Sequence, residues 1–312
     1  MVSAVFHSPS DASDALRADK ASTKPTSNPM SSTAAAATLP VTASSTPAAS
    51  KPATPSIDWV GLALKTLAPM AGIALLIGIW ALLTMKSTSF PTPLATWNEA
   101  VKLFADPFYR NSPNDQGIGW NILFSLKRVA MGFGLAAVVG IPMGFLIGRS
   151  TIASAMLNPI ISLLRPVSPL AWLPIGLLVF KSADPAAIWT IFICSIWPMI
   201  INTAVGVQRV PEDYLNVAKV LNLSEWKIVT KILFPSVLPY MLTGVRLSVG
   251  TAWLVIVAAE MLTGGVGIGF WVWDEWNNLN VHHILIAIFV IGIVGLMLEQ
   301  ALVSIAKRFS FE

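Results

Sequence analysis

Four ionisable side chains lie inside long apolar segments of this 312-residue chain, namely Arg165, Arg246, Glu260 and Glu299. A charge in hydrocarbon is costly, so each of them must either be paired or line a watery path. An arginine on such a path would offer planar, transient hydrogen bonds to a small anion. The alternative is a buried arginine–glutamate pair that fixes helix packing, with Glu299 available to either arginine. We favour pairing. An ionised Glu260 would line an anion path poorly, which indicates either pairing or a part in the structure of a gate for that residue.

The residues give little indication of catalytic, cofactor or metal chemistry. His282 and His283 are adjacent, so on a helix they point in different directions, and no cysteine lies nearby to complete a metal site. The glycine-rich run 264–269 follows an apolar segment instead of a strand, which favours a flexible turn over a dinucleotide-binding loop. The sequence contains no G-x-x-x-x-G-K-[ST] phosphate loop, so the chain is not expected to hydrolyse ATP alone. We predict no catalytic residue, no cofactor and no metal ion.

The composition is that of a membrane protein. Hydrophobic residues make up 54% of the chain and charged residues 12%, against roughly 25% charged in a typical soluble domain. Long apolar runs that do not alternate with polar residues favour helices, which satisfy their own backbone in lipid. We therefore expect an all-α polytopic membrane protein with about six transmembrane helices. The apolar runs lie at 67–86, 122–148, 159–180, 186–206, 236–262 and 284–305.

The N-terminal segment differs from the rest of the chain. Residues 1–56 are rich in Ser, Thr, Ala and Pro and poor in bulky apolar residues, so we expect a disordered tail ahead of a membrane domain at 57–312. We see no basic stretch followed by an apolar core, and therefore no signal peptide. Met30 is an alternative start, and the tail is interpreted as a dispensable leader, with a regulatory arm as the alternative.

The positive charges predict an orientation in the membrane. With the polar segment 207–235 in the cytoplasm, more lysines and arginines lie inside than outside, as the positive-inside rule requires. Both termini are then cytoplasmic, and Lys127 and Arg128 fall at the outer interface. The basic residues are dispersed, so nothing points to nucleic-acid binding, and the surrounding partner is the lipid bilayer.

A polar, basic island at 211–239 separates two of the apolar runs. Pro211 precedes two acidic residues and Lys219 lies near the end of the same segment, an order that matches the helix dipole. Asn222 suits a left-handed cap, and Ser224 can open a second short helix. A water-facing helical hairpin in a membrane protein indicates contact with a partner protein.

The spacing within this hairpin resembles the cytoplasmic loop of ABC-importer permeases, whose pattern is E-A-A, three residues, G, nine residues, I-x-L-P. Three positions match the pattern, and Asn222 replaces its glycine with the other residue that tolerates a left-handed conformation. The resemblance implies a loop that docks on a cytoplasmic ATPase. In this sequence the pattern falls on Asn216, Val217, Ala218, Asn222, Ile232, Phe234 and Pro235.

The first helix of the hairpin is expected to dock through an apolar face. Leu215, Ala218 and Leu221 recur at helical spacing, with Val217 beside them. Such a face can enter a groove on another protein. The alternative is an interfacial helix that lies on lipid headgroups.

The resemblance extends over roughly residues 60–312, which are similar to the nitrate, sulfonate and bicarbonate branch of ABC-importer permeases. It is carried by SLKRVAMGFGLAAVVGIPMGFLIGRS at 125–150, LLRPVSPLAWLPIGLLVF at 163–180 and TGVRLSVGTAWLVIVAAEML at 243–262. The string from Ala259 to Ile284 is most similar to nitrate permeases. The family implies the type I importer fold in the cell inner membrane, two cytoplasmic ATPases, and a periplasmic or lipid-anchored solute-binding protein. It also implies a pair of permeases, for which we expect a homodimer, with a pseudo-dimer as the alternative.

The predicted outer loop 263–281 is a candidate docking surface for that binding protein. Trp271, Trp273 and Trp276 suit an interfacial belt. Asp274 and Glu275 are expected to be exposed, either as part of a docking surface or in a merely solvated loop.

Prolines next to Arg165 predict an irregular stretch in the third apolar run. Pro166, Pro169 and Pro174 are closely spaced, and each lacks a backbone donor. The set indicates either an unwound segment that faces the pathway or simple helix kinks.

These observations and the resemblance lead to one functional prediction. We expect the permease of an ATP-driven importer for a small inorganic anion, nitrate foremost, with nitrite or cyanate also possible substrates. A bicarbonate or sulfonate/taurine permease is the alternative within the family. An ion-gradient-driven secondary transporter is the alternative of another class, although no inverted repeat is evident. A non-transporting scaffold would leave the intramembrane arginines unexplained.

Overall fold

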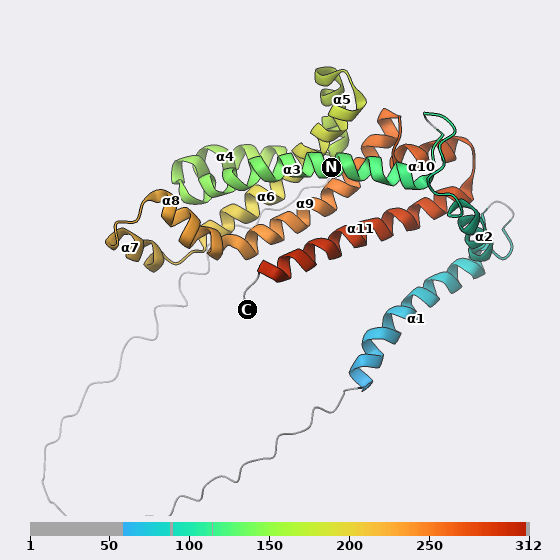
Figure 1. The fold of residues 1–312 in the computed structure, drawn as a ribbon, viewed down its shortest axis with the longest axis horizontal. Coiled ribbons are helices and arrows are strands. Elements are labelled where there is room, and N and C mark those ends of the chain that lie inside the picture. The colour runs from blue at the N-terminus through green and yellow to red at the C-terminus, as the bar shows by residue number, and fades with distance from the viewer. Residues whose placement is uncertain (1–58, 88–89, 114, 310–312) are drawn as a thin grey trace, which may run out of the picture. The chain divides into compact units, whose positions relative to one another are not determined.

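A computed structural model describes residues 59–87, 90–113 and 115–309, and the tail expected at 1–56 lies outside them. Every regular element in the described part is a helix, which confirms the predicted all-α class (Figure 1). The first six helices are α1 (Trp59–Thr84), α2 (Pro93–Leu103), α3 (Ile118–Arg149), α4 (Thr151–Leu164), α5 (Pro169–Phe180) and α6 (Ala183–Gln208). The others are α7 (Glu212–Val220), α8 (Glu225–Ile228), the π-helical η1 (Val229–Leu233), α9 (Phe234–Thr263), α10 (Ile268–Asn277) and α11 (Val281–Phe309).

Five of the described helical stretches are long and apolar enough to cross a membrane. They are α1, α3, α6, the continuous stretch Glu225–Thr263 and α11. A sixth span exists only if α4 and α5 are taken together, and these two helices meet at an angle of 100°. The apolar run predicted at 159–180 is therefore interrupted, and the break lies at the closely spaced prolines that predicted an irregular stretch. Pro166 lies in the break and lacks an N–H donor, while Pro169 begins α5, where a missing donor costs nothing.

Small residues let α3 and α6 approach closely. A Cβ added at Gly144 would lie 2.5 Å from Cβ of Thr203 and 2.8 Å from the Ile200 carbonyl oxygen, and one at Gly148 would lie 2.5 Å from Cβ of Val207. No side chain larger than hydrogen fits at either position, so the glycines set the distance between the two helices. This is the packing device that helices use in lipid, where the hydrophobic effect does not drive them together.

The other face of α6 packs against α9, again through small and polar groups. The Ser248 hydroxyl donates a 2.6 Å hydrogen bond to the Ser195 carbonyl, and both residues are buried. A Cβ at Gly244 would lie 2.9 Å from the Pro198 carbonyl oxygen. Together α3, α6 and α9 form the centre of the described fold, and this centre positions the charged groups described below.

Apolar side chains cover much of the remaining surface. Along α1 from residue 67 onward, and along α11, large apolar residues such as Leu83 and Met297 are exposed. In a soluble protein such an exposed apolar surface would favour aggregation, whereas in a bilayer it contacts lipid tails. Within the described residues, α1 is attached through Trp80, whose indole N–H donates to the Pro91 carbonyl and whose ring stacks on Phe289.

Candidate functional site: the polar hairpin and the intramembrane charges

The first helix of the polar hairpin ends in a Schellman motif. Asn222 has a φ of 49°, the left-handed conformation expected from its sequence position. The Leu223 N–H donates to the Ala218 carbonyl at 3.0 Å, and the Asn222 N–H donates to the Lys219 carbonyl, also at 3.0 Å. These bonds satisfy the last carbonyls of α7 and turn the chain sharply into α8. The bend therefore favours Asn or Gly at 222, the two residue types that adopt positive φ at low cost.

The apolar face predicted for docking is divided between two sides of α7. Ala218 is fully buried (0% exposed) and packs with Ile228, Leu233 and Val237, and Leu215 is half-buried against the same cluster. The helical spacing of Leu215 and Ala218 thus marks the side that faces the protein itself. Leu215 and Ala218 were predicted to lie on the docking face, and this prediction is corrected: they face the protein interior.

The outward side of α7 is formed by other apolar residues. Val220 is 80% exposed, and Val217, Leu221 and Tyr214 are exposed beside it. A shallow pocket on this side is lined by Asp213, Asn216, Val217, Val220 and Leu221. Large exposed apolar side chains rimmed by polar ones are typical of a protein-binding surface. We call Val217, Val220 and Leu221 the outward face of α7.

The second half of the hairpin is not a short helix, as the sequence predicted, but the beginning of a long one. From Glu225 the chain runs through the π-helical turn 229–233 and past Pro235 into α9. Pro235 has no N–H to donate, yet the helix continues through it. The preceding π turn shifts the backbone hydrogen-bond register at this point. Ile232 is half-buried and Pro235 exposed. Arg149, at the end of α3, forms an ion pair with Glu225 and ties the hairpin to the core.

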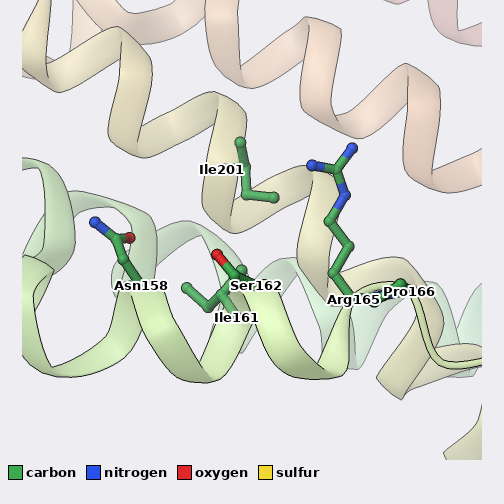
Figure 2. Close-up of a pocket in the computed structure, with 6 residues that line it drawn as sticks. All are labelled: Asn158, Ile161, Ser162, Arg165, Pro166 and Ile201. Atoms are coloured by element: carbon green, nitrogen blue, oxygen red, sulfur yellow. The ribbon is translucent and has the colours of Figure 1, made fainter. Parts of the chain in front are cut away.

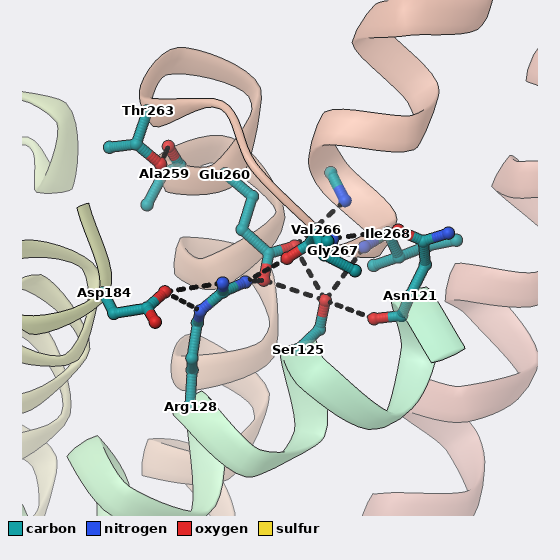
Figure 3. Close-up of polar contacts among 11 residues, drawn as sticks. Asn121, Ser125, Arg128, Asp184, Ala259, Glu260, Thr263, Val266, Gly267 and Ile268 are labelled. Atoms are coloured by element: carbon teal, nitrogen blue, oxygen red, sulfur yellow. Dashed lines mark hydrogen bonds and ion pairs between the residues drawn. The ribbon is translucent and has the colours of Figure 1, made fainter. Parts of the chain in front are cut away.

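At the opposite end of α9, Glu260 is buried (1% exposed) in a network of polar contacts (Figure 3). Arg128 Nη1 lies 2.6 Å from Glu260 Oε1, and Arg128 Nη2 lies 2.6 Å from Asp184 Oδ1. Ser125 Oγ donates to Glu260 Oε2 at 2.7 Å, as does the Gly269 N–H at 3.0 Å. Glu260 is therefore a paired charge, and its partner is a residue expected at the outer interface. The sequence contains an indication of this network: Asn121, Ser125 and Arg128 fall on one face of a helix.

The same network holds the turn between α9 and α10. The Gly267 N–H donates to Asn121 Oδ1 and the Ile268 N–H to Ser125 Oγ, both at 2.9 Å, while Arg128 donates to the Val266 carbonyl at 2.6 Å. Residues 264–267 of the glycine-rich run form the turn, and Ile268 and Gly269 begin α10. The expected flexibility is not what these contacts indicate, because Val266–Ile268 are fixed by side chains of α3.

Replacing Gly267 by alanine is expected to destabilise this turn. The new Cβ would lie 2.3 Å from Cδ of the buried Glu260, and overpacking of this kind costs about 1–3 kcal/mol. The apparent melting temperature of the purified protein should fall. Gly134→Ala is the matched control, because nothing lies within 4 Å of a Cβ there. Equal melting temperatures of the two variants would contradict the packing described.

Arg246 pairs with Glu299 and so joins α9 to α11. Arg246 Nε lies 2.9 Å from Glu299 Oε1. Of the two partners that the sequence allowed for Glu299, the structure selects Arg246.

Arg165 has no counter-charge among the described residues. It follows the last residue of α4 and lines a pocket of about 560 Å³ together with Asn158, Ile161, Ser162, Pro166 and Ile201 (Figure 2). Its side chain rises from α4 on the side that faces Ile201 of α6 (Figure 2). Of the four intramembrane charges, it alone remains unpaired within this part of the chain.

The predicted outer docking surface is only partly available. Trp271 is 8% exposed and its ring stacks on His283, with ring centroids 5.5 Å apart. Glu275 Oε1 lies 3.0 Å from His283 Nδ1 and is half-buried, so the expected exposure of Glu275 is wrong. Trp273, Asp274 and Trp276 do face outward. The inward turn of Trp271 and Glu275 follows from α10, a helix on which residues four apart share a face.

The helix α2 closes this cluster. Glu99 Oε1 lies 3.7 Å from His283 Nε2, and Lys102 donates a hydrogen bond to Glu99 Oε2 at 3.0 Å. The Lys102 ammonium lowers the pKa of the Glu99 carboxyl, which stays ionised toward His283. The pairing of His283 with carboxylates from α2 and α10 was not predicted from the sequence. The adjacent pair His282 and His283 has no spacing that would indicate partners on other helices.

Comparison with known proteins places this arrangement in a family. The sequence profile of the binding-protein-dependent transport system inner membrane component matches residues 139–310. The nitrate import permease protein of Leptolyngbya laminosa is 48% identical over 80% of this chain and 90% of its own length. The chain belongs to this family. The bicarbonate transport system permease protein of a Synechocystis strain is 44% identical to the permease over 77% of this chain and 88% of its own.

Solved structures show the same fold for the permease. A chain of the methionine ABC transporter in an inward-facing conformation gives a TM-score of 0.52 at 17% identity, covering 61% of the permease and 95% of that chain. A chain of an amino acid ABC transporter with histidines gives 0.50 at 15% identity, covering 70% and 100%. The predicted type I importer fold is confirmed. The polar hairpin of the permease lies within the segment matched by the family profile.

Proposed function

We propose that this chain is the membrane-spanning subunit of an ATP-driven importer that carries nitrate across the cell inner membrane. The observation that carries the proposal is its 48% and 47% identity, over 80% and 76% of its length, to two nitrate import permease proteins. The bicarbonate permease is the second candidate, because a relative of that name is 44% identical over 77% of the chain. Both anions are small, planar and monovalent.

The hairpin is the part of this subunit that would transmit the conformational change of an ATPase. We assign the outward face of α7 to the contact with a cytoplasmic ATPase, because this surface is apolar, exposed and rimmed by Asp213 and Asn216. Ala218 of α7 packs in one apolar cluster with Leu233 and with Val237 of α9, so a push on α7 can be transmitted to a spanning helix. In this orientation the hairpin and both termini face the cytoplasm.

The opposite end receives the anion. A periplasmic or lipid-anchored solute-binding protein would dock near Trp273, Asp274 and Trp276, which face outward from α10. A second copy of the chain completes the permease pair.

The proposal is tested by uptake of labelled nitrate, bicarbonate and taurine in cells with and without the chain. Loss of the chain is expected to abolish nitrate uptake and to spare the other two substrates. Loss of bicarbonate uptake alone would identify the second candidate. Nitrate uptake that survives depletion of ATP but collapses with the ion gradient would replace the ATP-driven importer by a secondary transporter.

A further inference from the structure

Arg165 is exposed on the described chain, but along the spanning helices it lies near their middle and not at their ends. Ile161, one helical turn earlier in α4, is buried in a cluster with Ala136 of α3 and Ile196 of α6. Both partners lie near the midpoints of helices long enough to cross a bilayer. A guanidinium at this depth is too far from either surface for its side chain to reach the headgroups easily. Its charge must therefore be met inside the membrane domain.

Arg165 ends a polar stripe along one face of α4. Ser154, Asn158, Ser162 and Arg165 recur at intervals of three or four residues, the spacing of a single helix face. Asn158 Nδ2 donates to Ser154 Oγ at 2.7 Å. The remaining surface of the helix carries apolar side chains such as Ile160 and Leu163. A stripe of this kind turned toward lipid would be strongly unfavourable, so it belongs against water or a polar ligand.

The backbone supports the same conclusion. The helix breaks by 100° directly after Arg165, and irregular backbone at membrane depth is tolerated only where it is buried in protein or lines a watery cavity. The pocket beside it, about 560 Å³, is lined by the three polar side chains of Asn158, Ser162 and Arg165. An amide, a hydroxyl and a guanidinium can all donate hydrogen bonds to an anion, and no carboxylate lines the pocket among the described residues.

We propose that this pocket is a transit site for a small planar oxyanion, with Arg165 as its charged ligand. The guanidinium fork suits two oxygens of one planar anion, while Ser162 and Asn158 supply neutral donors on the side nearer the hairpin. The inference rests on the proposed transport function and adds to it the residues that hold the anion on its way. Nitrate and bicarbonate share the required chemistry.

The first experiment measures whether water and anions reach the stripe. The chain has one cysteine, the buried Cys194, so an introduced thiol is the main target for labelling. In membranes that hold the full complex, an anionic methanethiosulfonate is expected to label Ser162→Cys at least about tenfold faster than Leu163→Cys, because only a hydrated thiol ionises readily. Leu163 is exposed on another face of α4 and serves as the matched control. Added nitrate should slow labelling at 162, whereas a change in the anionic lipid content of the membrane should not.

Two labelling results would overturn the proposal. Equal rates at 162 and 163 would mean that the stripe is not hydrated. Labelling that responds to the anionic lipid content of the membrane and not to nitrate would assign Arg165 to a lipid phosphate.

The second experiment separates transport from assembly. In proteoliposomes with the ATPase and the loaded binding protein, Arg165→Gln is expected to lower nitrate uptake per ATP hydrolysed by about 10- to 100-fold, the range for a lost charge-assisted contact. Arg165→Lys, which keeps the charge and loses the fork, should retain an intermediate rate. If uptake per ATP stays unchanged while wild-type protein imports nitrate, the transit site is refuted and the proposed function stands.

Two further outcomes are distinguished by the same measurement. If Arg165→Gln lowers total uptake only in proportion to the yield of assembled complex and leaves uptake per ATP unchanged, Arg165 is a packing contact with a second copy and the transit site is refuted. If wild-type protein imports neither nitrate nor bicarbonate with ATP, the proposed function fails, and the transit site fails with it.

Discussion

Arg128→Leu is expected to lower the stability of the permease by about 3–5 kcal/mol, because it leaves the buried Glu260 carboxylate without its counter-charge. Arg128 also bridges to Asp184 and to the Val266 carbonyl, so its loss removes an ion pair between α3 and α6 and a hydrogen bond to the turn before α10. The yield of folded protein and its apparent melting temperature should both fall steeply.

Lys127→Leu provides the matched control for this change. Lys127 is the neighbouring cation on α3 and is exposed, so its replacement should shift stability by no more than about 0.5 kcal/mol. The double variant Arg128→Leu with Glu260→Gln should recover part of the loss, since no buried charge is left unpaired. An Arg128→Leu protein as stable as the Lys127→Leu protein would contradict the network.

Val220→Asp is expected to reduce ATP-driven uptake by at least about tenfold, which corresponds to about 1.4 kcal/mol of lost coupling contact. Val220 is the most exposed residue of the outward face of α7 (80%), so a carboxylate there would be desolvated on docking while the isolated fold is unaffected. Less ATPase should co-purify with the variant, and the melting temperature should stay unchanged. Val220→Leu, which keeps an apolar surface, should transport normally.

Ala218→Asp tests the two sides of α7 against each other. Ala218 is fully buried against Val237 and Leu233, so aspartate there should lower the melting temperature as well as uptake. If Val220→Asp left uptake intact, the outward face would not be the docking surface. If Ala218→Asp left the melting temperature intact, the burial of α7 against α9 would be wrong.

Hydropathy was sufficient to predict the fold class and five of the spans, because a bilayer-length apolar run has few alternatives to a helix. The left-handed turn at Asn222 was equally predictable, since its conformation depends on a local preference that few residue types share. The bend after Arg165 was indicated by the prolines, but its angle of 100° could not be, since α5 also packs closely on α6, with Gly176 against Ala186 and Trp189.

The sequence could not resolve which side of α7 faces inward. Leu215, Val217, Ala218 and Leu221 are all apolar, and only the presence of α9 beneath Ala218 divides them into two sets. The pairing of Arg128 with Glu260 joins residues 132 positions apart. Local spacing predicts neighbours on one helix, whereas partners on different helices depend on tertiary packing.

The most direct test of the account is accumulation of labelled nitrate by proteoliposomes that contain the permease, its ATPase and its binding protein. We expect accumulation that requires both ATP and the binding protein and that is lost in the Val220→Asp permease. Accumulation driven by an ion gradient without ATP, or ATP-driven accumulation that the Val220→Asp change leaves intact, would contradict it.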